Sequence, residues 1–238
     1  MLLSTQAIVL QSIPYGDASV ITRMYTLERG MLSFIVKGAK GGKKNKKAAF
    51  LQPLSILEIE LNLRENHELQ YLREMRISEP FSDLPFSAAK TAQALFIAEV
   101  LRKAIQEEEK NEAMFSFIFD ALCLLDKSPE QPDFHLKFLL ELSHYLGFHP
   151  INNYDKNHPY FQYTDGVFHH SFGETCLNLQ QSEHIATLIN CSFSELSAQR
   201  FTRAQRRQLS RNILLYFKWH LPSMGELQTP EVLEEVFG

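Results

Sequence analysis

The chain reads Leu57-Glu58-Ile59-Glu60-Leu61-Asn62-Leu63 within its N-terminal third. Apolar and polar side chains alternate there with a period of two, which is typical of a β-strand with one buried and one solvated face. Similar apolar runs surround this segment and are separated by turn-forming residues. They predict strands at Thr5–Ser12, Ser19–Thr26 and Met31–Lys37, and a fifth strand whose inward face carries Leu69, Tyr71, Met75 and Ile77.

Five predicted strands in fewer than 80 residues, without a long helix, indicate a small closed barrel. The five-stranded OB-fold is the favoured architecture, and its loops and open strand face often bind oligonucleotides. An SH3-like barrel is the alternative. Two prolines between Ser78 and Pro85 mark a boundary, so the sequence predicts an OB-fold domain over residues 1–79 and a second domain over 80–238.

After residue 80 the apolar residues repeat with the 3.6-residue period of a helix. Residues 152–176 interrupt this pattern and indicate a small hairpin insert with Asp165-Gly166 near its turn. A short helix near His184–Asn190 follows, with Ser182 as the candidate N-cap. The predicted class is therefore α+β, a barrel followed by an α-helical bundle. The helical stripes are Ala94, Ile97, Leu101 and Ala104; Met114, Ile118, Ala121 and Leu125; and Phe134, Phe138, Leu142 and Tyr145.

A cationic segment, residues 37–47, joins the third and fourth predicted strands. It holds six lysines, three glycines and no acid. Glycine lets backbone amides approach a phosphate closely and lysine supplies point charge, so the segment suits a polyanion. A solvated surface loop is the alternative interpretation. Tyr15 and Tyr25 are candidates for base stacking, but strand aromatics in a small barrel more often belong to its core. The candidate DNA-binding residues are Lys37, Lys40, Lys43, Lys44, Lys46 and Lys47.

A second basic group lies in the last long helix, which is expected to begin at Thr202 with a capping box to Gln205. Its inward stripe is expected to end at His220. Cations in the first turns oppose the helix dipole, so helix stability alone does not explain them. Either a carboxylate such as Glu195 or an external anion compensates their charge. This candidate patch, for DNA or for an acidic partner tail, comprises Arg203, Arg206, Arg207 and Arg211.

The formal net charge of −4 does not by itself suggest a nucleic-acid partner. Residues 1–80 hold 11 Lys and Arg against 8 Asp and Glu, whereas residues 81–238 hold 13 against 20. This uneven distribution indicates local basic patches. The three cysteines form no Cys-x-x-Cys pair, and neither a signal peptide nor a membrane-spanning run is evident. We therefore expect a cytoplasmic protein.

The sequence lacks the motifs of the common enzyme classes. A phosphate-binding loop needs a final Ser or Thr, but Gly42-Lys43 is followed by Lys44. One group of residues has the composition of a metal site, although it lacks the closely spaced pairs of structural zinc sites. Its members are His158, His169, His170 and Cys176. We predict no catalytic residue, no cofactor and no bound metal, and an enzyme built on that group is a further hypothesis.

Several short motifs occur in a distinctive order. They are Val9-Leu10, Tyr15-Gly16-Asp17, Ser19, Thr26-Leu27-Glu28-Arg29-Gly30, Lys37-Gly38-Ala39, Leu51-Gln52-Pro53 and Leu146-Gly147-Phe148-His149-Pro150. With these motifs the chain resembles the RecO family of bacterial recombination and repair mediators. Many members carry a four-cysteine zinc module at the insert, where only Cys176 is present here. The resemblance thus implies a metal-free variant, held by packing of Tyr160, Phe161, Tyr163 and Phe168.

The resemblance implies a non-enzymatic mediator that binds single- and double-stranded DNA without sequence specificity and anneals complementary strands. It also implies that the protein helps to load recombinase on strands coated with single-stranded-DNA-binding protein. The implied partners are DNA, a RecR-like protein and the C-terminal tail of the single-stranded-DNA-binding protein, with no membrane and no small-molecule substrate. The alternative is a protein–protein adaptor that binds acidic partners through its helical domain and has little DNA affinity.

Overall fold

The computed structural model describes residues 2–39, 46–65, 67–105, 109–198 and 201–230, together with Leu233 and Val236. The chain forms two compact units, Met1–Lys127 and Ser128–Gly238. The first unit contains the barrel and also the first two long helices, so the predicted boundary near residue 79 lies inside it. The division into domains at residues 1–79 and 80–238 stays a prediction.

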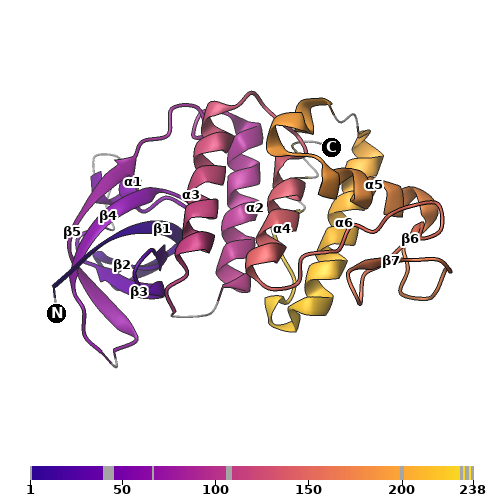
Figure 1. The fold of residues 1–238 in the computed structure, drawn as a ribbon. Coiled ribbons are helices and arrows are strands. Elements are labelled where there is room, and N and C mark those ends of the chain that lie inside the picture. The colour runs from indigo at the N-terminus through magenta and orange to yellow at the C-terminus, as the bar shows by residue number, and fades with distance from the viewer. Residues whose placement is uncertain are drawn as a thin grey trace. The chain divides into compact units, whose positions relative to one another are not determined.

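Unit 1 begins with a closed five-stranded barrel (Figure 1). The strands follow the order β1-β2-β3-β5-β4, in which β1 pairs with both β2 and β4, and β3 runs parallel to β5. This topology confirms the predicted OB-like barrel and the α+β class. The elements are β1 (Leu2–Tyr15), β2 (Ser19–Thr26), β3 (Gly30–Val36), α1 (Lys46–Phe50), β4 (Ile56–Asn62) and β5 (Leu69–Glu79).

The alternation at residues 57–63 behaves as predicted over most of its length. Leu57, Ile59 and Leu61 are fully buried in the barrel core, whereas Glu58 and Glu60 are only partly buried. Burying these three leucine and isoleucine side chains contributes roughly 1.5–3 kcal/mol each. The period of two therefore fixes which face of β4 lines the core.

The predicted inward face of β5 is wrong at Leu69 and Tyr71. The buried residue between them is Gln70, and Tyr71 is 45% exposed, whereas Leu72, Met75 and Ile77 pack against the barrel core. The register of β4 against β5 shifts between Glu60 and Leu61. Such a β-bulge places two residues of one strand opposite a single residue of its partner. Residues before and after the bulge that would otherwise share a face therefore point to opposite sides of the sheet. The bulge thus turns Tyr71 outward while Met75 and Ile77 stay inward.

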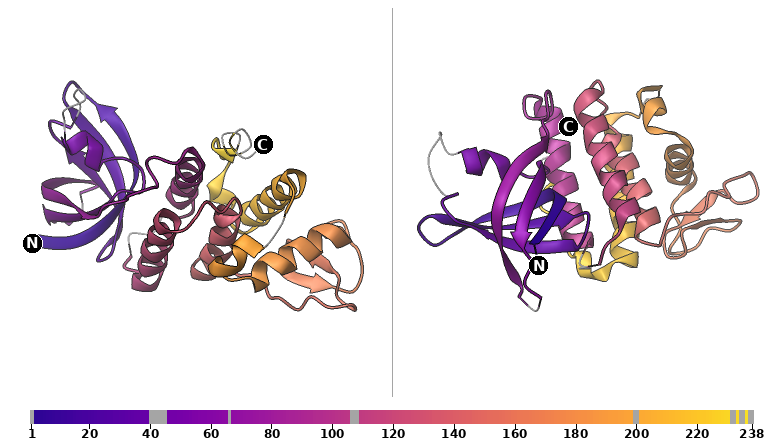
Figure 2. Two further views of the ribbon diagram at one scale, coloured as in Figure 1. Left: turned by 90° about the horizontal axis from the view of Figure 1, so that it is seen from above. Right: turned by 60° about the vertical axis from the view of Figure 1, so that its left-hand side comes forward.

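Two helices, α2 (Ala88–Ala104) and α3 (Glu112–Lys127), run side by side next to the barrel (Figures 1 and 2). Asp126 near the end of α3 fastens the segment that enters α2. Its buried carboxylate accepts hydrogen bonds from the backbone N–H groups of Ser82, Asp83 and Leu84, at 2.7–3.1 Å. The Nζ of Lys90 donates to the Asp126 carbonyl oxygen at 2.8 Å. These contacts attach the end of α3 to α2 and to the segment that leads into it from β5.

Unit 2 is helical and carries a two-stranded hairpin, as predicted (Figure 2). Gly166 lies in the hairpin turn with a φ of +69°, a backbone conformation that glycine adopts without strain. The elements are α4 (Phe134–Tyr145), β6 (Tyr160–Gln162), β7 (Val167–His169), α5 (Leu179–Asn190), η1 (Phe193–Ala198), α6 (Arg203–His220) and η2 (Pro222–Met224).

The predicted N-cap of α5 is wrong. Asn178 caps this helix in a reciprocal capping box with Gln181. Ser182 lies one turn inside and is buried, where its hydroxyl accepts from the Phe161 N–H at 2.8 Å and donates to the Leu177 carbonyl at 3.1 Å. Ser182 therefore attaches the hairpin to α5, a long-range role that a local capping pattern does not reveal.

Candidate nucleic-acid interface

An apolar row crosses the outer face of the barrel. Cross-strand pairing joins Ile13 of β1 to Ile21 of β2, Ile21 to Ile35 of β3, and Ile35 to Tyr71 of β5. Ile13 is 47% exposed, and Ile21 and Ile35 are half-buried. Solvated strand faces usually carry polar residues, so this row indicates a surface that contacts apolar or aromatic groups.

Cations surround the aromatic end of the row. The Nζ of Lys37 lies 5.6 Å from the centroid of the Tyr71 ring, and the guanidinium carbon of Arg64 lies 5.8 Å from it. Both distances are within the range of cation–π attraction. Arg73 is exposed on the same strand as Tyr71, and Arg23 lies on β2 in the adjoining cross-strand row. An exposed aromatic ring between cations is the combination that binds bases and phosphates of a single strand.

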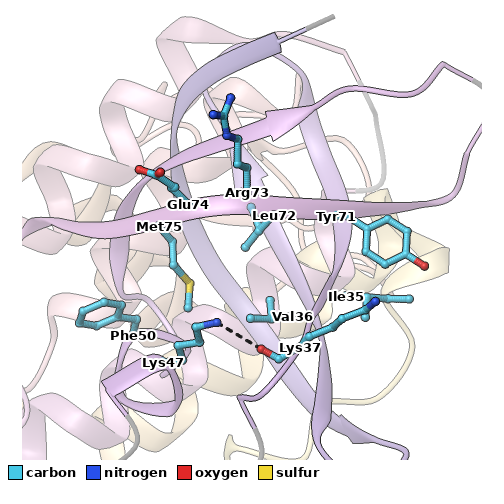
Figure 3. Close-up of a pocket in the computed structure, with 10 residues that line it drawn as sticks. All are labelled: Ile35, Val36, Lys37, Lys47, Phe50, Tyr71, Leu72, Arg73, Glu74 and Met75. Atoms are coloured by element: carbon cyan, nitrogen blue, oxygen red, sulfur yellow. Dashed lines mark hydrogen bonds between the residues drawn. The ribbon is translucent and has the colours of Figure 1, made fainter.

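The structure describes only part of the predicted lysine segment. Lys37 and Lys47 are exposed, and the Nζ of Lys47 donates to the Lys37 carbonyl oxygen at 3.4 Å, so the two ends of the segment lie together (Figure 3). Lys40, Lys43 and Lys44 lie outside the described residues. Lys46 begins α1, but its side chain is likewise outside the described part. The role of these four lysines in DNA binding stays a prediction.

A slot opens beside Tyr71, where β3 and β5 separate (Figure 3). It has a volume of about 460 Å³, within the range of about 300–1,000 Å³ that is usual for small-molecule sites. Its lining residues are Ile35, Val36, Lys37, Lys47, Phe50, Tyr71, Leu72, Arg73, Glu74 and Met75.

The two tyrosines considered for base stacking differ in the structure. Tyr25 is 1% exposed and packs against Phe115 of α3 with 6.0 Å between ring centroids, so it belongs to the core. Tyr15 is 53% exposed at the end of β1. Tyr71 was missed as a candidate. The sequence of β5 carried no clear signal for it, because the β-bulge that turns Tyr71 outward depends on the pairing with β4.

The outer face of β4 has the opposite charge. Glu58 pairs across the sheet with Arg76 of β5, and Glu60 pairs with Glu74. The Arg76 guanidinium donates two hydrogen bonds to one Glu58 oxygen, at 2.6 and 3.0 Å. β5 carries residues of both groups: Tyr71 pairs with Ile35 of β3, and Glu74, three residues further along, pairs with Glu60 of β4.

The capping box that starts α6 is confirmed, with reciprocal hydrogen bonds between Thr202 and Gln205. The predicted patch is altered because Arg206 is engaged internally. Its Nε donates to Asp133 Oδ1 at 2.6 Å, and the two side chains are 15% and 3% exposed. Glu195 does not take this role, since it accepts from the backbone N–H and hydroxyl of Ser192. We therefore leave Arg206 out of the candidate interface.

The remaining arginines Arg203, Arg207 and Arg211 are exposed on α6. Arg211 and Lys218 also border a groove of about 300 Å³ between α6 and the segment after η2. Glu226, which lies 3.8 Å from Lys218, is on the same border. The apolar lining consists of Leu214, Leu215, Met224, Leu227 and Pro230. An apolar groove with cations at its edge suits a peptide that ends in apolar and acidic groups.

The hairpin is held by aromatic packing. Phe161 and Phe168 are buried with 5.1 Å between their ring centroids, and Phe161 lies 5.7 Å from the ring of Tyr216 on α6. Burial raises the pKa of the Tyr216 hydroxyl, which donates to the Phe148 carbonyl. Within the described ranges, no group of three or more His, Cys, Asp or Glu residues is arranged to hold a metal ion.

Comparison with known proteins identifies the family. Residues 1–81 match the model described as recombination protein O N terminal, and residues 86–226 match recombination protein O C terminal. The chain belongs to the RecO family. It is 36% identical over 239 residues to the DNA repair protein RecO of Flavobacterium psychrophilum and 33% identical over 240 residues to that of Christiangramia forsetii. Each alignment covers 100% of both chains.

Membership of the RecO family confirms the expected general role in DNA repair and recombination. RecO proteins are recombination mediators and not enzymes, so the expectation of a non-enzymatic protein also follows. Among the helices in the described part of the chain, none is both long and apolar enough to cross a bilayer.

Proposed function

We propose that this RecO-family protein binds single- and double-stranded DNA without sequence specificity through the Tyr71 face of its barrel, and anneals complementary strands there. The observation that carries the proposal is the apolar row Ile13–Ile21–Ile35–Tyr71 with Lys37 and Arg64 at its aromatic end. Phosphates lie on the cations and supply affinity without reading sequence, while unpaired bases lie over the row.

Annealing follows from the same electrostatics. Two complementary strands repel each other because both are polyanions, and a cationic surface that holds one of them lowers that repulsion. Lys37, Lys47 and Arg64 supply charge in the described part of the face. The lysines Lys40, Lys43, Lys44 and Lys46 extend it in this proposal.

The salt dependence of single-strand binding tests the proposal. Contact with about five phosphates predicts a slope of about −3.5 for log affinity against log salt concentration. Replacing Lys43, Lys44, Lys46 and Lys47 together with Ala is expected to weaken binding and to flatten that slope by about 0.7 for each phosphate that no longer meets a lysine. Arg76→Ala, on the Glu58 face, is the control and should leave both unchanged. If the lysine variant keeps the affinity and the salt slope of the natural protein, these four lysines do not contact DNA.

A second surface supports a protein partner. The groove bordered by Arg211 and Lys218 suits the acidic, apolar C-terminal tail of single-stranded-DNA-binding protein, and holding this tail would bring the protein to coated strands. Such recruitment accounts for help in loading recombinase. A RecR-like partner is proposed from family membership.

Peptide binding distinguishes this role from the DNA role. Reversing Arg211 and Lys218 to Glu is expected to weaken binding of a tail peptide about tenfold or more, because hydrogen bonds between charged groups contribute about 1.5–3 kcal/mol. Reversal of Lys156, an exposed residue of the same unit that lies outside both the groove lining and the arginine patch, is the control. Tail binding without measurable DNA affinity would instead favour the adaptor hypothesis.

A further inference from the structure

The slot beside Tyr71 arises from the way in which two strands separate. β3 pairs with β5 only over Ser33–Ile35 and Leu69–Tyr71. Beyond Tyr71, β5 continues along β4, and α1 lies over the opening that is left (Figure 3). A pocket at a barrel opening suits a bound group, since most of its lining residues lie on strands.

The interior of the slot is apolar. Leu72 and Met75 point from β5 towards Val36 and α1, and Phe50 of α1 closes the far side (Figure 3). Val36 belongs to the barrel core, and Phe50, Leu72 and Met75 pack against that core while remaining partly exposed. The slot therefore offers flat aliphatic and aromatic contact to a group that enters it.

The edge of the slot is cationic. Lys37 and Lys47 both line it, and the hydrogen bond from Lys47 Nζ to the Lys37 carbonyl holds the two residues together. Arg73 and Glu74 point to the other side of β5 (Figure 3). An apolar interior beneath two lysines complements a group with a flat, weakly polar body and an attached anion.

We propose that the slot holds one unstacked base of a bound single strand, with the phosphates next to that base on Lys37 and Lys47 and a neighbouring base on Tyr71. This inference rests on the proposed DNA binding and adds the expectation that single strands bind more tightly than duplexes. A base in a duplex enters only after it is unpaired and unstacked, which opposes binding. A base in a single strand has no pairing to lose.

Strands that lack one base test the slot while leaving every phosphate in place. Oligothymidylates of about eight nucleotides, within the site size of an OB-fold, would each carry a single abasic residue at a different position. We expect one position to bind about five- to a hundredfold more weakly than the intact strand. If every abasic strand binds as tightly as the intact one, the slot holds no base.

Filling the slot provides a second test. Met75→Trp is expected to weaken single-strand binding, to abolish the abasic effect and to leave duplex affinity unchanged. Ile77→Trp is the matched control, because Ile77 is also a partly exposed residue of β5 packed on the core but does not line the slot. Equal losses for single strand and duplex, or no loss for either, would overturn the proposal. Thermal unfolding checks that both variants fold. If Met75→Trp does not fold, the abasic strands on the natural protein decide whether the slot holds a base.

The two proposals fail in different ways. Absence of salt-dependent binding to any strand would overturn the proposed DNA function and the base site with it. Salt-dependent binding that is the same for intact and abasic strands would overturn the base site alone. If an acidic tail peptide binds the natural protein and loses affinity in Met75→Trp but not in Ile77→Trp, while abasic strands bind normally, the slot serves a peptide and the base proposal is wrong.

Discussion

Replacing Arg206 with Ala is expected to destabilise unit 2 and not to act through a ligand. The substitution removes a 2.6 Å hydrogen bond to Asp133 and a 3.2 Å bond to the Phe201 carbonyl. Asp133 is 3% exposed, so its charge would be left buried without its partner. Breaking a buried pair in this way costs about 3–5 kcal/mol. Urea unfolding at pH 7, followed by circular dichroism, measures the loss as a lower midpoint.

The pH dependence of this loss is a further expectation. Burial already raises the pKa of Asp133, although the hydrogen bond and charge of Arg206 oppose that rise. Without Arg206 the pKa rises further, so the carboxyl takes up a proton at a higher pH and the buried charge disappears. The difference in stability between Arg206→Ala and the natural protein should therefore shrink as the pH falls from 7 towards 5, by at most 1.36 kcal/mol per unit.

Arg207→Ala is the matched control, because Arg207 is exposed on the next position of the same helix. Substitutions at such positions usually change stability by about 0.5 kcal/mol or less. Asp133→Asn combined with Arg206→Ala should recover part of the loss, since no buried charge is then left over. Equal stability of Arg206→Ala and Arg207→Ala would refute the reasoning, and Arg206 would return to the candidate binding residues.

Three further predictions concern a carboxylate, an aromatic ring and a glycine. Burial raises the pKa of Asp126, but hydrogen bonds from Leu84, Ser82 and Asp83 outweigh this effect and lower the pKa. The stability gained from the lowered pKa is present above about pH 4 and is lost as the pH falls below it. Urea midpoints measured at a series of pH values should therefore fall less steeply below about pH 4 in Asp126→Asn than in the natural protein. Tyr71→Ala should weaken single-strand binding by about 1–3 kcal/mol in a fluorescence titration, with the salt slope nearly unchanged. Gly166→Ala should lower the thermal midpoint through a cost of about 1–3 kcal/mol, because φ is +69° and an added Cβ would lie 2.8 Å from the Tyr216 hydroxyl.

The barrel and the helices could be predicted because their signals are local. The alternation in Leu57–Leu63 decides one strand by itself, and the stripe that contains Phe134 and Phe138 decides α4. The capping box at Thr202 needs only residues three apart. Patterns of this kind record which side of an element is buried, and that information lies within a few consecutive residues.

The candidate site was harder to predict because its signals depend on distant partners. The β5 bulge that exposes Tyr71 arises from register against β4, which the sequence of β5 alone does not state. The partner of Arg206 lies 73 residues away, and the hydroxyl of Ser182 meets a strand 21 residues before it. In each case the role of a residue was predicted from its neighbours in sequence, whereas its actual environment is set by tertiary contacts.

A local group of cations explains how a chain with a net charge of −4 is able to offer a surface to a polyanion. At physiological salt, exposed charges more than about 8 Å apart are largely screened, so a bound strand responds to the residues beside it and not to the total. Lys37 and Arg64 lie at Tyr71, while Glu60 and Glu74 face each other across β4 and β5. The acidic pair repels phosphates locally, and this repulsion disfavours a path over β4. Glu60 and Glu74 thus help to confine a strand to the row that ends at Tyr71.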